Sequence, residues 1–189
     1  EIQIGNISRP HRLFGSTLEI KNAKTYFDQL KEAGVTVDRN SRLSHIKDLV
    51  RTYEKNQKVK PDLTEPLLNE LTDLVESPLL VTGSFDESFL SLPPEVLSTV
   101  MKSHQRYIPL FKANNEFDPL SLDSRNILLP SFLCISNGLS SAKEKIILGN
   151  EKVLKARFSD ASFFIGSDLL INSSSRINKL KDVTFAEGL

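Results

Sequence analysis

Apolar residues recur at helical spacing in the first third of the chain. Asn22 precedes residues 23–33, where alanine, leucine and aromatic side chains return every three or four positions, and Gly34 follows. Asparagine is a preferred N-cap and glycine is common just beyond a helix end, so this pattern predicts a helix. A second helix is predicted from near Asn40, with apolar positions up to Tyr53. The polar stretch after it breaks at Pro61, the best internal boundary.

After Pro61, short apolar runs alternate with amphipathic segments. The pattern predicts helices over residues 67–75 and 95–102, a long helix after the Asn137-Gly138 turn and a last helix over 168–180, with strands over 79–82, 106–111 and 128–135. This alternation indicates a mixed α/β (α+β) fold, in which a small mixed sheet packs with several helices. We expect residues 1–60 to form an N-terminal helical part of one compact domain and residues 61–189 its mixed α/β core.

The long helix sets polar side chains into an apolar stripe at residues 149–164, GNEKVLKARFSDASFF. Asn150 and Arg157 lie about 20° apart on one helix face, which we predict to be buried. Because an unpaired buried guanidinium costs on the order of several kcal/mol, we expect Asp160 to pair with Arg157. Two residues at a helix-to-strand junction complete a predicted structural polar motif of His104, Gln105, Asn150, Arg157 and Asp160.

Charge is balanced overall but unevenly placed. The 189 residues carry 24 basic and 24 acidic side chains, yet residues 61–100 hold 8 acidic and no basic ones. Such a block repels a phosphate backbone, so any RNA contact should use the flanking thirds. An acidic solvated face without a partner is the alternative interpretation of this block.

The candidates for RNA contact are basic residues of the two flanks. The set predicted to bind RNA is Arg12, Lys102, Arg106, Lys152 and Lys155. His11, His104 and Tyr107 are interleaved with them as candidates to stack on bases or pack on ribose. Glu151 is expected to pair with Lys155 at i,i+4. Such pairs are also common on solvated helix surfaces that bind nothing, which is the alternative interpretation of these charges.

The sequence shows no catalytic constellation. None of His11, His45 and His104 has a second histidine or cysteine at metal spacing, so no metal site is predicted. There is no Gly-rich phosphate loop and no nucleophile elbow. The single cysteine, Cys134, cannot form an internal disulfide, which fits a reducing compartment, and is either a small buried hydrophobe or a reactive thiol. No apolar run approaches the roughly 20 residues of a bilayer span.

Five blocks of the sequence, taken in order, resemble one family, the β subunit of the bacterial-type heterotetrameric glycyl-tRNA synthetase. The blocks are PHRLFG (10–15), the acidic stretch 67–97, MKSHQRYIPLF (101–111), LPSFLCISNG (129–138) and the 149–164 segment. The departures are Arg106 and Ile108, where the family commonly has lysine and phenylalanine, and a longer loop at 112–128. Because the chain opens with Glu1 and ends where the family continues, we expect a fragment of a longer polypeptide.

The resemblance implies a part of an aminoacyl-tRNA synthetase, the enzyme that joins glycine to its tRNA at the expense of ATP. The class II site would lie in the α subunit or a fused α region, so ATP and Mg²⁺ belong to the full enzyme and no cofactor is expected here. The implied partners are the tRNA for glycine and that α subunit or region, without a membrane, in the cytoplasm or in a plastid or other organelle.

The resemblance also extends to the B3/B4 region of the phenylalanyl-tRNA synthetase β subunit, a mixed α/β fold that houses editing there. The leading expectation is a noncatalytic tRNA-handling and scaffold domain. One alternative is an editing-like hydrolytic domain that acts on mischarged tRNA through His104, with Gln105 or Asn150 positioning the ester. Another is a purely architectural module in which Arg157 holds two elements together.

Overall fold

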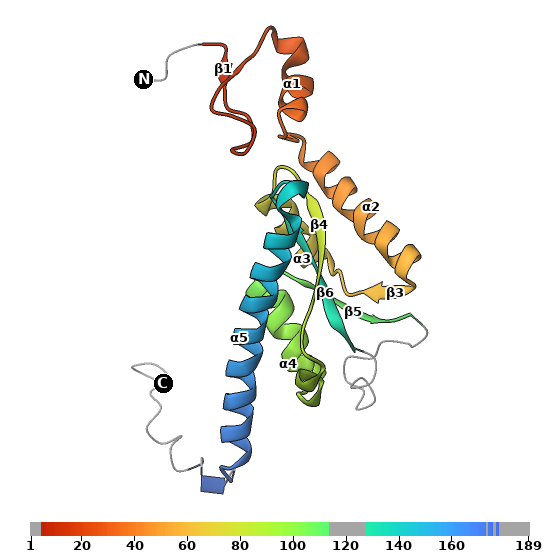
Figure 1. Ribbon diagram of the computed structural model, residues 1–189, viewed down its shortest axis with the longest axis vertical. Coiled ribbons are helices and arrows are strands. Elements are labelled where there is room, and N and C mark those ends of the chain that lie inside the picture. Colours follow the sequence, from red (N-terminus) through yellow and green to blue (C-terminus); the bar gives the residue numbers. More distant parts are fainter. Residues whose placement is uncertain (1–4, 114–127, 173, 176, 178–189) are drawn as a thin grey trace, which may run out of the picture.

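The N-terminal end of the molecule is a small lobe joined to the core by a long helix. The computed structural model describes residues 5–113, 128–172, 174, 175 and 177. The lobe contains strands β1 (Ile7–Ser8) and β2 (Leu18–Glu19), the 3-10 turn η1 (Ala23–Thr25) and helix α1 (Tyr26–Glu32). Helix α2 (Arg39–Gln57) leads from it to the core (Figure 1).

The core is a four-stranded antiparallel sheet. Its strands are β3 (Val59–Pro61), β5 (Ile108–Lys112), β6 (Leu128–Ser136) and β4 (Leu79–Ser84), in the spatial order β3-β5-β6-β4. The register between β5 and β6 shifts between Pro109 and Phe111. The fold is therefore mixed α/β, as the alternation of patterns predicts. The expectation of a mixed sheet is wrong, because all of the described strand pairings are antiparallel.

Helices cover both faces of this sheet because successive strand residues point to opposite sides. Helices α2 and α3 (Glu65–Leu74) pack on the face that carries Leu133 and Ile135. The other face carries Phe132 and Cys134 and is covered by α4 (Pro94–Thr99), the π-helical turn η3 (Val100–His104) and α5 (Lys143–Leu169). The 3-10 turns η2 (Glu87–Ser91) and η5 (Ser140–Ala142) precede α4 and α5.

The first predicted helix has the ends that its sequence specifies. The Asn22 side chain accepts a hydrogen bond from the Thr25 backbone N–H at 3.1 Å. At the other end Gly34 has φ +80°, and the N–H groups of Gly34 and Val35 donate to carbonyls in the last turn of α1. This is the Schellman arrangement, which places a residue in the left-handed region just past the helix.

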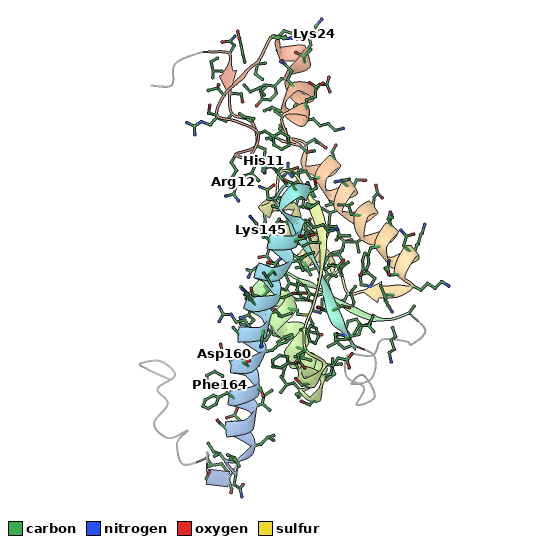
Figure 2. All side chains as sticks on the ribbon, viewed as in Figure 1. His11, Arg12, Lys24, Lys145, Asp160 and Phe164 are labelled. Atoms are coloured by element: carbon green, nitrogen blue, oxygen red, sulfur yellow. The ribbon has the colours of Figure 1, made fainter. Side chains whose placement is uncertain are left out.

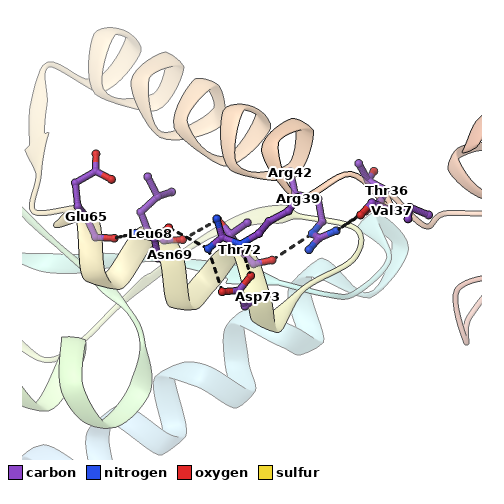
Figure 3. Close-up of polar contacts among 9 residues, drawn as sticks. All are labelled: Thr36, Val37, Arg39, Arg42, Glu65, Leu68, Asn69, Thr72 and Asp73. Atoms are coloured by element: carbon purple, nitrogen blue, oxygen red, sulfur yellow. Dashed lines mark hydrogen bonds and ion pairs between the residues drawn. The ribbon is translucent and has the colours of Figure 1, made fainter.

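Two arginines in the first turns of α2 fasten that helix to α3 (Figure 3). Arg39 makes two hydrogen bonds to the Asp73 carboxylate, at 2.7 and 3.0 Å, and a third to Asn69. The Arg42 guanidinium is half-buried and donates to the backbone carbonyl oxygens of Thr36, Val37 and Thr72, at 2.7, 2.9 and 3.2 Å. The entry to α2 is thereby fixed against the end of α3.

Some predicted boundaries are wrong. The strand predicted from Arg106 begins at Ile108, because Arg106 has φ +57° and cannot continue an extended strand. The helix predicted over 95–102 is divided into α4 and η3.

Other predictions stay open. The division into parts 1–60 and 61–189 and the resemblance to a B3/B4 region stay predictions. Most of the longer loop, residues 114–127, lies outside the described residues, as do 173, 176 and 178–180 of the predicted last helix. Asp168 and Leu169, where that helix was expected to start, belong to α5.

Candidate nucleic-acid interface

Helix α5 is anchored to the sheet by one face. Leu154 and Phe158 are completely buried, and the Phe158 ring meets Phe85 edge-on at 5.0 Å between centroids. The Glu151 carboxylate accepts hydrogen bonds from both the backbone N–H and the hydroxyl of Ser84, at 2.8 and 2.9 Å. The predicted pairing of Glu151 with Lys155 is therefore wrong, because β4 takes this carboxylate.

The outer side of α5 presents three lysines, Lys145, Lys152 and Lys155, all exposed. We call them the lysine row. Lys145 and Lys152 lie about 20° apart around the helix and about 10.5 Å apart along it. Neither makes a hydrogen bond or ion pair with any residue that the structure describes. The spacing of Lys145 could have been recognised from the sequence, because it stands seven residues before Lys152.

Lys155 lies near an acidic residue of another segment, Asp86, which precedes η2. The pKa of Asp86 is lowered mainly by hydrogen bonds from Ser88 and to a lesser degree by the charge of Lys155. Asp86 and Lys155 form no direct ion pair within the described parts of the chain. The Lys155 ammonium is thus attracted to Asp86 but remains exposed.

Arg12 lies on the same side of the molecule as Lys145, as Figure 2 shows. Its position depends on its neighbour His11, which is completely buried. The His11 Nδ1 accepts from the Leu13 N–H at 3.3 Å, which makes Nε2 the donor to the Asn137 carbonyl at 3.2 Å. His11 therefore ties the loop that carries Arg12 to the end of β6.

The predicted stacking residues differ in exposure. His11 is fully buried and Tyr107 is buried, with the Tyr107 ring stacked on Phe132 at 4.6 Å. Burial also raises the pKa of Tyr107 to about 12. Of the three, His104 alone is exposed. The interpretation of His11 and Tyr107 as base-stacking residues is therefore wrong.

Two of the predicted RNA-binding cations, Lys102 and Arg106, are held in internal pairs. The Lys102 Nζ lies 2.5 Å from an Asp62 carboxylate oxygen, and both side chains are largely buried. The Arg106 Nε lies 2.6 Å from Glu70, and its terminal nitrogen donates to the carbonyls of Ser103 and His104. Their charges act within the fold, and a role in RNA binding stays a prediction.

These pairs belong to a wider pattern that explains the acidic block. Four of its carboxylates pair with Lys or Arg side chains from the flanking segments. The pairs are Asp62–Lys102, Glu65–Lys47, Glu70–Arg106 and Asp73–Arg39. Half of the eight acidic residues are thus paired internally, whereas Lys145 and Lys152 have no ion-pair partner among the described residues.

The predicted polar motif does not form one cluster. Asn150 is half-buried beside Cys134, and its Nδ2 is buried without a hydrogen bond to the described residues. Burial raises the pKa of Cys134 to about 11, which the nearby Asn150 amide opposes. Cys134 is half-buried, and its neutral thiol is a poor nucleophile, which favours the interpretation as a small hydrophobe over a reactive thiol.

Arg157 and Asp160 are exposed, so the predicted burial of Arg157 is wrong. Arg157 and Asn150 do lie about 20° apart around the helix. The buried stripe, however, runs through Leu154 and Phe158, so Asn150 lies at its margin and Arg157 outside it. No ion pair joins Arg157 to Asp160 within the described segments. At η3, His104 is exposed and Gln105 half-buried, and no hydrogen bond links either to Asn150 in the part described.

Within residues 5–113 and the described part of 128–177, no three His, Cys, Asp or Glu side chains gather as metal ligands. Over the same residues, none of the helices combines the length and apolar character that crossing a membrane requires.

The fold and the lysine row together define a mixed α/β domain with a basic helix surface. Comparison with known sequences specifies its class further. The family model described as glycyl-tRNA synthetase beta subunit matches residues 1–189. Similar curated proteins are the glycine–tRNA ligase beta subunits of Trichodesmium erythraeum (42% identical over 98% of this chain), Streptococcus agalactiae serotype III (41%, 99%) and Bacillus subtilis (38%, 100%).

The chain belongs to the glycyl-tRNA synthetase β-subunit family, a class of aminoacyl-tRNA synthetase subunits. It spans 25% of the length of the Trichodesmium relative and 26% of the lengths of the other two.

Proposed function

We propose that this chain is a noncatalytic tRNA-handling and scaffold domain of a glycine–tRNA ligase β subunit. It supports the ATP-dependent attachment of glycine to its tRNA by holding the RNA, while the ligase chemistry takes place elsewhere in the enzyme. Its partners are the tRNA for glycine and the α subunit or a fused α region, and its compartment is the cytoplasm or an organelle.

The observation that carries this proposal is the lysine row. Three ammonium groups project from the outer side of a helix whose inner face is fixed by Leu154, Phe158 and the Glu151–Ser84 hydrogen bonds. Cations on a rigid element attract a phosphate backbone without the cost of ordering the backbone that carries them. Arg12 extends the charge toward the N-terminal lobe (Figure 2).

The scaffold part of the proposal rests on the contacts that join separate segments. His11 connects the N-terminal loop to β6, and Arg39 and Arg42 connect α2 to α3. These contacts fix the lobe that carries Arg12 relative to the core that carries the lysine row. The surface thus has a defined shape rather than being a set of independent charges.

The test is charge reversal on α5 with a matched control on another face. The test variant is Lys145→Glu, Lys152→Glu, Lys155→Glu. The control reverses three exposed cations of α2 and β3, Arg51→Glu, Lys55→Glu, Lys60→Glu, which changes the net charge equally. We expect the α5 variant to bind a glycine tRNA transcript more than about tenfold more weakly than the control, since each phosphate contact contributes to affinity.

The same α5 substitutions in the complete enzyme should leave glycyl-adenylate formation intact and lower aminoacylation. Equal affinity for the two variants would contradict the proposal, because net charge rather than the lysine row would then set binding. Loss of adenylate formation would contradict the noncatalytic role.

A further inference from the structure

A groove of about 580 Å³ lies between η2 and the C-terminal half of α5. Phe89 contributes a ring from η2 and Phe163 a ring from α5, while the hydroxyl-bearing residues Ser159, Ser162 and Ser167 line it together with Gly166 and Leu170. Aromatic rings beside hydroxyl groups are what a nucleobase needs, because its faces stack and its edges form hydrogen bonds.

The groove continues the line of the lysine row. Ser159 stands four residues after Lys155 and seven after Lys152, which places it about 6 Å and about 10.5 Å farther along the helix. Lys152 and Ser159 lie within about 20° of each other on the same face. An RNA strand held by these lysines therefore reaches the groove without changing its direction.

Phe163 is 70% exposed, and its ring contact is with the neighbouring Phe164 at 5.7 Å. Phe164 is also exposed and projects from α5 in Figure 2. Adjacent exposed apolar side chains, unlike a single exposed one, mark binding surfaces. The lysine row farther along the same helix and the serines that line the groove favour a nucleotide over an apolar protein segment.

We propose that this groove binds one unpaired nucleotide of the RNA that the lysine row holds. The base stacks on Phe163 and its edge meets the serine hydroxyls, while the phosphates of the nucleotides that precede it along the strand lie by Lys155 and Lys152. The inference rests on the proposed function and adds to it that the RNA contacts α5 where a duplex ends in a single strand. Asp86 competes with the phosphate for Lys155, since its carboxylate lies near that lysine.

Two RNA probes and three single variants test this. The probes are a hairpin RNA with a short unpaired 3′ tail and the same hairpin with a blunt end. Phe163→Leu removes the aromatic face but keeps an apolar side chain, Phe163→Tyr keeps the face, and Phe27→Leu alters an exposed phenylalanine on α1 as a control. Thermal unfolding of each variant checks that the fold is unchanged.

For the unaltered 189-residue chain, we expect tighter binding of the tailed hairpin than of the blunt one. Phe163→Leu should weaken binding of the tailed hairpin by roughly 5- to 150-fold, the range that a base–aromatic stack carries, and leave the blunt hairpin unaffected. Phe163→Tyr and Phe27→Leu should bind both probes as the unaltered chain does. A further variant, Asp86→Asn, which retains a capping side chain, should tighten binding of the tailed hairpin.

The failures of the two proposals differ. Binding of both hairpins that depends on the lysine row but not on the tail or Phe163 would overturn the nucleotide site and leave the proposed function standing. In that case a protein segment becomes the better occupant of the groove. Binding that is independent of the lysine row would overturn both.

Discussion

A single methyl group added at Gly83 should destabilise the core measurably. Gly83 of β4 lies opposite Phe132 of β6, and a Cβ at Gly83 would stand 2.4 Å from Cζ and 2.8 Å from Cε1 of that ring. Ordinary van der Waals contact begins at 3.4 Å. The ring cannot retreat easily, because Phe132 is fully buried and stacked on Tyr107. The methyl group must therefore displace β4 or repack the aromatic pair.

The magnitude follows from two opposing effects. Overpacking a close-packed core lowers the free energy of unfolding by about 1–3 kcal/mol. Replacing glycine by alanine opposes this, because it restricts the unfolded chain and raises the free energy of unfolding by about 0.4–1 kcal/mol. The net decrease expected for Gly83→Ala is about 1–2 kcal/mol in the free energy of unfolding. The neighbouring Ser84 anchors Glu151, so a shift of β4 also disturbs the attachment of α5.

Urea unfolding of four proteins measures this effect and its cause. They are the unaltered chain, Gly83→Ala, Phe132→Leu and the double variant. In the Phe132→Leu background the ring is gone, so Gly83→Ala should no longer destabilise and should leave stability unchanged or raise it by about 0.4–1 kcal/mol. The steric explanation would be refuted if Gly83→Ala were as stable as the unaltered chain. It would also be refuted if the substitution destabilised both backgrounds equally.

Two further predictions concern the scaffold. Arg42→Lys should lower the free energy of unfolding by about 1–3 kcal/mol in a urea titration. The reason is that a single ammonium cannot reach the three carbonyls that the planar guanidinium contacts. An unchanged urea midpoint would contradict this expected loss. The raised pKa of Cys134, about 11 against an ordinary 9.0, favours the neutral thiol in the fold, so its contribution to stability is complete below pH 9.0 and is lost as pH rises toward 11. The difference in unfolding free energy between the unaltered chain and Cys134→Ala should therefore shrink between pH 9.0 and 11. In a second experiment, iodoacetamide should label Cys134 slowly until urea is added. Rapid labelling of the native protein near neutral pH would contradict the raised pKa.

Local signals in the sequence predicted what local chemistry determines. The cap at Asn22 and the left-handed Gly34 define the first helix through contacts within a few residues, and both were predicted. The side of α5 that would be buried could not be read in the same way. The orientation of α5 depends on the contact between Phe158 and Phe85. These residues lie 73 positions apart in the chain and meet only in the tertiary fold.

Long-range pairing also explains why the sequence does not reveal which of the candidate cations are paired within the fold. The charges of Lys102 and Arg106 look free in the sequence, but their partners Asp62 and Glu70 precede them by 40 and 36 residues. Composition cannot distinguish such a pair from an exposed cation. Lys145, by contrast, follows from the helical period alone, because residues seven apart share a face.

The most direct test of the central claim is the salt dependence of tRNA binding. If the lysine row neutralises phosphates, each lysine releases counterions on binding and adds to the slope of log affinity against log salt. Replacing all three lysines with glutamine should reduce the magnitude of that slope by roughly 2–3, at about 0.7–0.9 for each phosphate that is no longer neutralised. The control with glutamine at Arg51, Lys55 and Lys60 should retain the slope. An unchanged slope for the lysine-row variant would contradict the account.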